Sequence, residues 1–364
     1  MSNTTLWLKG RVYSLEELKE GAGSSSTSFE ESTLTFCKDW LNGKADFEIQ
    51  TSGSTGVPKK ISFTREQLEA SAQLTAKALD LKNNFNALVC LDTKYIAGQM
   101  MLVRSFVTGM HIYAVEPSSN PFASLDSKIK IDFAAMVPYQ LQALLDSPNE
   151  DRLHSIHTII IGGAATSNGL IKRLQNYSCR CYATYGMTET ISHVALRKLN
   201  GANSEEYFHP LDSVHLAIDH RGCLVIQAPH ITEEQIATND LVELKEDQSF
   251  KILGRWDNVI NTGGVKISPE IAEEKIKAVF AQLALPNRLF LAAMPDEKLG
   301  SKVTLIIEGN PFPASTLDAI SEELMKSLSR FELPRAIRFI EAFEETDTQK
   351  INRKKTTDLL FHVK

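Results

Sequence analysis

The sequence predicts an α/β protein that begins with a largely parallel sheet and ends in a smaller α+β domain. Between residues 47 and 184, short apolar or β-branched runs alternate with segments of helical spacing, a pattern typical of parallel strands joined by helices. From about residue 213 the runs are shorter and are joined by turns such as His220-Arg221-Gly222, which predicts an antiparallel, partly barrel-like subdomain. After residue 257 helix and strand patterns alternate again.

The chain length and the change in strand and helix pattern along the sequence together predict two domains. A chain of 364 residues is long for one domain and comfortable for two. We place a large N-terminal domain at residues 1–254, with its β-rich part at about 213–254. Residues 255–257 would form a hinge, and residues 258–364 would form a small, mobile C-terminal domain.

Residues 1–46 are expected to be peripheral. A short apolar run is followed by a helix-like segment and by a Gly/Ser-rich stretch at 21–28 that resembles a linker. An amphipathic helix at about 34–41 then leads to a strand at 47–50. Beyond residue 60, Thr64 with Gln67 three residues later forms a capping box that predicts a helix start.

The sheet of the large domain is expected to use five further apolar runs, at 87–91, 111–115, 133–137, 158–161 and 181–184, with a helix through 100–108 between the first two. In open sheets of this kind ligands bind at the carboxyl ends of the strands. The small domain is expected to hold a helix at 269–281, strands at 289–293 and 302–308, and a helix at 315–330. Its last segment, residues 350–355, is basic and has no apolar periodicity.

Composition excludes several classes of protein. The formal net charge of −6 gives no electrostatic reason to expect nucleic acid or an anionic membrane as a partner. No apolar run approaches the roughly 18 residues that span a bilayer, and the N-terminus shows no signal peptide. Five cysteines, without metal-ligand or redox spacing, indicate reduced thiols and a cytoplasmic location: Cys37, Cys90, Cys179, Cys181 and Cys223.

The most informative stretch follows the strand at 47–50. Glycines free the backbone N–H groups to point inward, and hydroxyls and lysines complete a cradle for a polyphosphate. A proline before the first lysine forbids the helical turn of the common P-loop. The stretch, residues 51–60, reads Thr51-Ser52-Gly53-Ser54-Thr55-Gly56-Val57-Pro58-Lys59-Lys60.

Further polar motifs follow predicted strands. Tyr185-Gly186-Met187-Thr188-Glu189 places a hydroxyl and a carboxylate at a strand end, which suits Mg²⁺ bound to a nucleotide phosphate, and Tyr185 offers a flat face for adenine. Gly163 and Ala164 lie in a close-approach loop after the strand at 158–161. Asp240 precedes another strand, where a capping or turn role is the ordinary alternative.

In this order the motifs resemble those of the adenylate-forming enzymes: acyl-CoA synthetases, luciferases and peptide-synthetase adenylation domains. The resemblance covers residues 47–353 and implies ATP and Mg²⁺ binding. It implies that the loop at 51–60 clamps the ATP phosphates, that Gly163, Ala164 and Tyr185 flank adenine, and that Asp240 binds the ribose. The family usually has an acidic residue where Ala164 or Ala165 stands, and glycine where Asn239 stands.

The same resemblance gives roles to the interdomain segment and the C-terminus. It implies that Arg255 binds ribose and phosphate, that Asp257 is the hinge, and that Gly263-Gly264 lines the pantetheine tunnel of CoA. Lys350 resembles the mobile catalytic lysine, whose charge would stabilise the transition state of adenylation. Thr348-Gln349 replaces the usual Ser-Gly before it. Catalytic roles are therefore assigned to Lys350, Glu189, Thr188 and Arg255.

The chain is short for this family, which we interpret as an N-terminally shortened form with a compact pocket for a small acid. Two segments, 189–197 and 94–98, most resemble short o-succinylbenzoate–CoA ligases of menaquinone biosynthesis. That acid has two carboxylates, so one needs cationic or hydroxyl partners while the other is activated. The residues that we predict for this role are Lys94, Gly98, Ser192 and His193.

The expected reaction joins a small carboxylic acid, ATP and CoA in two steps through an acyl adenylate, with domain alternation about Asp257 between the steps. Three alternatives stay open: another aryl or small-acid CoA ligase, an adenylation enzyme that loads a carrier-protein thiol, and a non-catalytic nucleotide-binding relative. The sequence does not give the oligomeric state.

Overall fold

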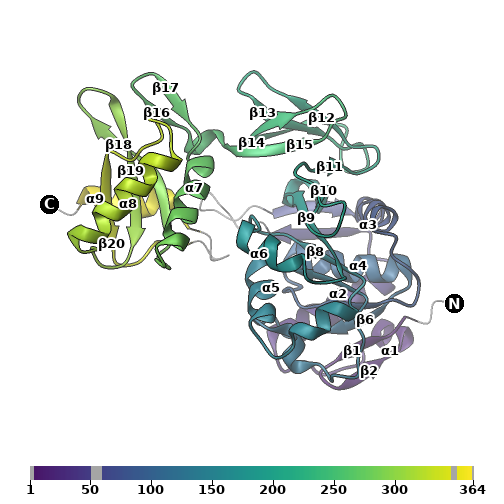
Figure 1. The fold of residues 1–364 in the computed structure, drawn as a ribbon. Helices are drawn as coiled ribbons and strands as arrows, with labels where there is room; N and C mark the ends of the chain where they lie inside the picture. The colour runs from purple at the N-terminus through teal and green to yellow at the C-terminus, as the bar shows by residue number, and fades with distance from the viewer. Residues whose placement is uncertain (1–3, 51–59, 346–350, 363–364) are drawn as a thin grey trace.

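The computed structural model describes residues 4–50, 60–345 and 351–362. These form a large lobe at the N-terminal side and a smaller C-terminal lobe, with a four-stranded sheet above the large lobe (Figure 1).

The centre of the large lobe is a nine-stranded sheet with the order β11-β10-β9-β8-β7-β5-β6-β1-β2. Its six inner strands from β9 to β1 are parallel to one another, and β10, β11 and β2 add antiparallel edges. The expected largely parallel sheet is therefore confirmed. The strands are β1 (Leu6–Leu8), β2 (Arg11–Tyr13), β5 (Asn86–Val89), β6 (His111–Ala114), β7 (Phe133–Met136), β8 (Thr158–Ile161), β9 (Arg180–Gly186), β10 (His193–Lys198) and β11 (His209–Pro210).

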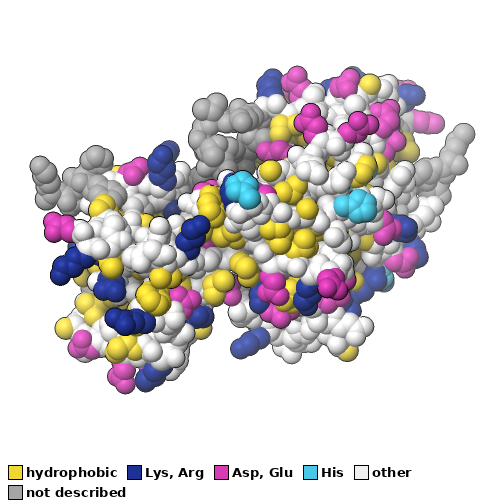
Figure 2. Space-filling model, turned by 90° about the horizontal axis from the view of Figure 1, so that it is seen from above, with side chains coloured by type: hydrophobic (Ala, Val, Ile, Leu, Met, Phe, Trp, Pro, Cys, Tyr) yellow, Lys and Arg dark blue, Asp and Glu magenta, His cyan; other side chains and the backbone are white. Residues whose placement is uncertain are grey.

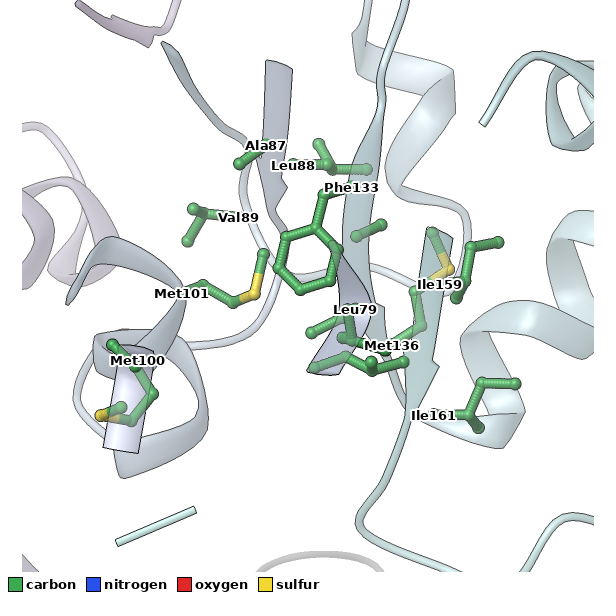
Figure 3. Close-up of a cluster of buried hydrophobic side chains, with 14 of the residues drawn as sticks. Leu79, Ala87, Leu88, Val89, Met100, Met101, Phe133, Met136, Ile159 and Ile161 are labelled. Atoms are coloured by element: carbon green, nitrogen blue, oxygen red, sulfur yellow. The ribbon is translucent and has the colours of Figure 1, made fainter. Parts of the chain in front are cut away.

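Helices join these strands and cover the sheet. They are α1 (Leu15–Glu20), α2 (Ser28–Leu41), α3 (Arg65–Leu79), α4 (Ile96–Thr108), α5 (Pro138–Leu145) and α6 (Asn168–Leu174), with short 3₁₀ turns η1 (Pro121–Ser124) and η2 (Glu150–Ser155). Figure 3 shows the core where α4 meets the sheet, with Met101 pointing toward the ring of Phe133. Both side chains are fully buried.

The N-terminal segment is not peripheral, and that expectation was wrong. β1 pairs in parallel with β6, so the run Leu6-Trp7-Leu8 extends the central sheet, and Leu6 is fully buried. The expected linker is also shorter, because Thr27 caps α2 and the helix begins at Ser28. A three-residue strand carries too little pattern to reveal its partner, which lies about a hundred residues away in the chain.

The run at 47–50 does not join the central sheet, and that expectation was wrong: β3 (Asp46–Gln50) pairs antiparallel with β4 (Lys60–Thr64) in a separate hairpin. The polyphosphate motif lies between these two strands in the sequence. Gln50 and Lys60 are register partners, so the motif joins two paired strand ends. Residues 51–59 themselves lie outside the described residues. The capping box at Thr64 is confirmed, with Gln67 closing it at the start of α3.

The β-rich subdomain is an antiparallel sheet with the order β12-β13-β14-β15. Its order is linear, so among the described residues it is open and does not close into a barrel. Its strands are β12 (His215–Ile218), β13 (Cys223–Gln227), β14 (Ile236–Leu244) and β15 (Phe250–Arg255), and a 3₁₀ turn, η4 (Trp256–Asn258), follows directly.

The C-terminal lobe has its own hydrophobic core. The core of the large lobe ends at Phe250, and that of the small lobe begins at Ile260. This separation supports the proposed hinge at 255–257, which we keep as a proposal. The elements are β16 (Ile260–Thr262), β17 (Val265–Ile267), α7 (Pro269–Gln282), β18 (Leu289–Asp296), β19 (Gly300–Glu308), α8 (Ala314–Ser327), β20 (Ala336–Ile340) and α9 (Arg353–His362).

The sequence did not reveal α9, because its helical pattern is weak. Its first residue is instead held by an ion pair. The Arg353 guanidinium donates to both carboxylate oxygens of Glu273, at 2.6 and 2.8 Å, and Glu273 is almost fully buried on α7. Among the described residues no helix is long and apolar enough to cross a membrane.

Candidate functional site

Four predicted site residues meet in one network where the large lobe approaches the four-stranded sheet. The Tyr185 hydroxyl donates to Asp240 Oδ2 at 2.7 Å, and Arg255 Nη1 donates to Asp240 Oδ1 at 3.4 Å. Arg255 also donates to both oxygens of Asp257, at 2.9 and 3.0 Å. The residues expected to bind the ribose and to form the hinge are thus connected through one guanidinium.

Strand register explains this meeting. Asp240 on β14 and Arg255 on β15 are directly paired across the sheet, although fourteen residues separate them in sequence. Tyr185 lies near the end of β9, and its ring packs edge-on against Phe250 of β15. Burial and the Asp240 charge raise the pKa of Tyr185, so its hydroxyl stays protonated and serves as a donor.

The sequence predicted that Tyr185 offers an open face to adenine, but most of its ring is buried. It is only 7% exposed and contacts Phe208 as well as Phe250. Its hydrogen bond to Asp240 gives it a second role, which is to orient the carboxylate predicted to bind the ribose. Stacking of adenine on Tyr185 stays a prediction.

The loop after β9 is tightly fixed. A Cβ at Gly186 would lie 2.3 Å from the carbonyl oxygen of Ser192, so only glycine fits. The buried Thr190 hydroxyl donates to the Ser192 carbonyl at 2.7 Å and accepts from the Met187 amide at 2.9 Å. Ile191 has φ = +63°, a strained value for a β-branched residue, and strain of this kind is concentrated at functional sites.

Thr188 and Glu189 belong to a 3₁₀ turn in this loop, η3 (Thr188–Thr190). Glu189 is exposed, and within the described part of the chain its carboxylate forms no ion pair. No cluster of three or more metal-ligating side chains occurs among the described residues. A metal here would therefore need oxygen ligands from a bound phosphate as well as from the protein.

Gly163 and Ala164 lie directly after β8, which neighbours β9 in the sheet. Both are exposed, and Gly163 has φ = +83°. They therefore share the carboxyl edge of the sheet with the Tyr185 loop, as expected for two segments around one ligand. Ala164 can contribute only its backbone and a methyl group.

A second group of polar residues surrounds Arg104, which the sequence analysis did not single out. Arg104 on α4 is 2% exposed, and its Nη2 donates to the Ser192 hydroxyl. Ser192 also contacts His193 Nδ1 at 3.4 Å, while His193 Nε2 contacts the Thr75 hydroxyl at 3.1 Å. Two of the predicted acid-binding residues, Ser192 and His193, are thus beside a buried arginine.

Arg104 has no carboxylate partner within the described residues, and its Nε is buried without a hydrogen bond. Burial lowers the pKa of Arg104 to about 9, so it stays charged at neutral pH. Burial and the Arg104 charge hold the pKa of His193 well below its usual value, so His193 is neutral there. The available signal in the sequence was a single charge inside the apolar run Met100-Met101-Leu102-Val103-Arg104.

Two other predicted acid-binding residues are placed differently. Lys94 is exposed before α4, and no described side-chain contact links it to Ser192 or Arg104. Gly98 is buried on α4, where a Cβ would lie 2.4 Å from the Asp92 carbonyl oxygen. Because α4 packs closely against the preceding loop, only glycine fits at position 98. Direct roles for Lys94 and Gly98 in acid binding stay predictions.

The segment between the lobes is also closely packed. Gly254 has φ = +147°, and a Cβ there would lie 2.1 Å from Ser268 Oγ. Asn258 donates to Glu270 at 2.6 Å just after Asp257. Gly263 and Gly264, with φ of +57° and +82°, form the exposed turn between β16 and β17.

The remaining predicted residues lie outside the described ones. These are the loop residues Thr51, Ser52, Gly53, Ser54, Thr55, Gly56 and Lys59, and the lysine Lys350. Glu345 and Ile351, on either side of Lys350's segment, form an antiparallel bridge in the small lobe.

Asp240 is supported by Arg221, at the turn between β12 and β13. Arg221 donates to Asn239 Oδ1 at 2.8 Å and to the Thr238 carbonyl at 2.9 Å, and its Nε is held by Asp219 at 2.8 Å. Arg221 thus fixes the two residues before Asp240, including the asparagine that replaces the family's usual glycine.

We expect Arg221→Ala to raise the KM for ATP about tenfold with little change in kcat, because a displaced Asp240 weakens nucleotide binding in the ground and transition states alike. Arg221→Lys should recover part of the loss, since it keeps the charge near Asp219. Steady-state kinetics with varied ATP would measure both effects. An equal fall in kcat for both variants would contradict this positioning role.

Known proteins are similar to most of this chain. Residues 47–225 match the model of the AMP-binding enzyme family. The solved structure of an acyl-CoA synthetase (AMP-forming)/AMP-acid ligase II-like protein from Dyadobacter fermentans is 40% identical, with 94% of this chain and 97% of that chain covered and a TM-score of 0.62. The 2-succinylbenzoate–CoA ligase of Haemophilus influenzae is 28% identical over 362 residues, covering 90% of this chain and 77% of the ligase.

The fold is also that of the Bacillus subtilis o-succinylbenzoate CoA synthetase solved with its acyl-adenylate intermediate, at a TM-score of 0.73 and 19% identity, with 94% and 79% of the two chains covered. The sheet, the four-stranded subdomain and the small C-terminal lobe define the class of adenylate-forming enzymes. The chain belongs to the AMP-binding enzyme family, and within it groups with the AMP-forming acyl-CoA ligases.

Proposed function

We propose that this protein is a carboxylate–CoA ligase that acts through an acyl adenylate, and that its acid is 2-succinylbenzoate. The observation that carries the choice of acid is Arg104, a buried guanidinium without a carboxylate partner among the described residues. A buried charge left unpaired is costly, so an anionic ligand is the natural partner for it.

The nucleotide is assigned to the Tyr185–Asp240–Arg255 network. Asp240, held by Tyr185 and Arg255, would accept hydrogen bonds from the ribose hydroxyls. The Arg255 side chain is half-exposed although its nitrogens contact Asp240 and Asp257, so its positive charge is accessible to a phosphate. The polyphosphate motif between β3 and β4 in the sequence would hold the phosphates that leave as diphosphate.

Magnesium fits the donor set, because Glu189 offers an exposed carboxylate without a competing cation and Thr188 a hydroxyl. The related B. subtilis synthetase was solved with ATP and a magnesium ion. When bound, Mg²⁺ would neutralise phosphate charge. The chain's own contribution is to hold Glu189 and Thr188 in the loop that Thr190 fixes.

We assign the second carboxylate of the acid to the group formed by Arg104, Ser192 and His193. The dicarboxylate would place its second carboxylate against Arg104, whose Nε has no acceptor, with the Ser192 hydroxyl beside it. Neutral His193 would add no charge. Relatives named 2-succinylbenzoate–CoA ligase, at 24–28% identity, support the same acid and a place in menaquinone biosynthesis.

Carboxylate-dependent exchange of diphosphate into ATP tests the proposal. The panel would contain 2-succinylbenzoate, benzoate, acetate and amino acids, with and without Mg²⁺. We expect exchange with 2-succinylbenzoate to exceed exchange with benzoate at least tenfold, since only the former has a second carboxylate for the Arg104 guanidinium. Exchange with another acid alone would overturn the choice of acid, and no exchange at all would favour a non-catalytic relative.

A further inference from the structure

The three-stranded sheet β18-β19-β20 of the C-terminal lobe has a cavity that is lined by none of the predicted site residues. Thr304 on β19 is the register partner of Ala292 on β18 and of Ala336 on β20. Three small side chains therefore lie side by side across the sheet, which leaves space above them. The cavity has a volume of about 330 Å³, and its lining residues are Met294, Pro295, Lys302, Thr304, Ala336 and Arg338.

The Thr304 hydroxyl in this cavity is buried and unused. Thr304 is 1% exposed, and its Oγ1 has no hydrogen-bond partner among the described residues. Its two cross-strand neighbours are alanines, whose side chains offer no polar group. Burial of a hydroxyl without a hydrogen bond is costly, and valine would fill the same space without that cost. The hydroxyl therefore points to a ligand in the cavity.

Two cationic side chains flank the row of small residues. Lys302 is two residues before Thr304 on β19, and Arg338 pairs with Ile306, two residues after it. The Lys302 ammonium lies 3.8 Å from Asp296, which is beyond hydrogen-bond distance. The Arg338 guanidinium donates to the carbonyl of the residue before it at 3.2 Å, and in the described part of the chain it forms no ion pair. Both cations can therefore meet an anion.

Basic side chains occur at several places on this lobe, at the left of Figure 2, so charge alone does not mark a site. A buried, unpartnered hydroxyl between two cations is more specific. A phosphate group carries close to two negative charges and three acceptor oxygens, so it can satisfy all three donors. A carboxylate has one charge and two oxygens. The volume exceeds that of a phosphate ion, and Met294 and Pro295 add apolar surface for an organic group.

We propose that this cavity binds the phosphate group of a small organic phosphate. Lys302 and Arg338 would neutralise its charge, and the Thr304 hydroxyl would donate a hydrogen bond to it. Met294 and Pro295 would contact the organic part. The inference does not depend on the proposed ligase function, because the residues assigned to the nucleotide and the acid do not line this cavity.

Methyl NMR of the full chain with ¹³C-labelled methionine methyl groups tests the proposal. Met294 reports on the cavity, and Met187, in the loop after β9, reports separately on the predicted nucleotide site. The probes are phenyl phosphate, inorganic phosphate and benzoate. They distinguish an organic phosphate from the free ion and a phosphate from a carboxylate.

The variants are Thr304→Val, Lys302→Gln and Arg338→Gln. Arg335→Gln is the matched control, because Arg335 is an exposed arginine directly before β20 that lines a different cavity. Thr304→Val keeps the shape of the side chain and removes only the unpartnered hydroxyl. It should therefore melt at or above the wild-type temperature, so that weaker binding in this variant cannot be ascribed to unfolding.

We expect phenyl phosphate to shift the Met294 resonance saturably and more tightly than inorganic phosphate does. Each of the three cavity variants should raise the Kd for phenyl phosphate about tenfold, as the loss of a hydrogen bond to a charged group predicts, and Arg335→Gln should match the wild type. An unshifted Met294, an unchanged Kd in Thr304→Val, or equal binding of benzoate would overturn the inference. Equal affinities for the two phosphates would overturn the organic ligand and assign the site to the free ion.

Discussion

Replacing Arg104 by methionine is expected to lower kcat/KM for 2-succinylbenzoate by two to three orders of magnitude and, at the same time, to raise the melting temperature. The loss would follow from losing the proposed charge-assisted contact between the buried Arg104 and the second carboxylate. The gain arises because methionine fills similar space and removes a buried charge that lacks a carboxylate partner.

Exchange kinetics with 2-succinylbenzoate and benzoate, together with thermal unfolding, measure both effects. Benzoate has no second carboxylate, so its kcat/KM should change little. Arg180→Met is the matched control. Arg180 lies at the N-terminal end of β9, whereas Ser192 follows the C-terminal end of this strand. The Arg180 guanidinium donates to the Leu79 carbonyl at 2.8 Å and to the Thr158 hydroxyl. This variant should destabilise the protein without altering acid preference. Equal losses for both acids in Arg104→Met would refute the role of Arg104 in binding the second carboxylate.

Lys350→Ala is expected to slow acyl-adenylate formation by a factor of about 10² to 10³, while the conversion of a supplied adenylate to the thioester continues. The positive charge would act only while charge develops between carboxylate and α-phosphate, so its loss affects one half-reaction. Diphosphate exchange measures the first half-reaction, and CoA-dependent release of AMP from synthetic acyl adenylate measures the second.

Lys354→Ala and Lys355→Ala are suitable controls, because both lysines lie on α9, near Lys350 in sequence, and make no ion pair among the described residues. Both half-reactions should keep their wild-type rates in these variants. If Lys350→Ala lost both half-reactions to the same degree, the lysine would not be specific to adenylation.

Most of the secondary structure that the sequence predicted correctly was predicted from local patterns of residues. The alternation of strands and helices over 87–184 predicted the parallel sheet, and the capping box at Thr64 predicted the start of α3, because both depend on neighbouring residues. The strand at 47–50 was wrongly included in that sheet, since it pairs with β4 instead. β1 and α9 escaped prediction because long-range contacts decide their placement: β1 pairs with β6, and Arg353 at the start of α9 pairs with Glu273.

In the candidate site, too, some features were predictable from the sequence and others only from the tertiary structure. By itself the sequence determined the family resemblance and predicted the nucleotide-binding residues, because glycines, hydroxyls and charges at strand ends in that order are typical of this family. Only the tertiary structure decided that Tyr185 orients Asp240, that Arg221 supports it, and that Arg104 lies buried beside Ser192 without a carboxylate partner. An unpaired buried charge is identified by the absence of a carboxylate near it. Both this absence and the burial depend on contacts between segments that are distant in the chain, which the sequence does not show.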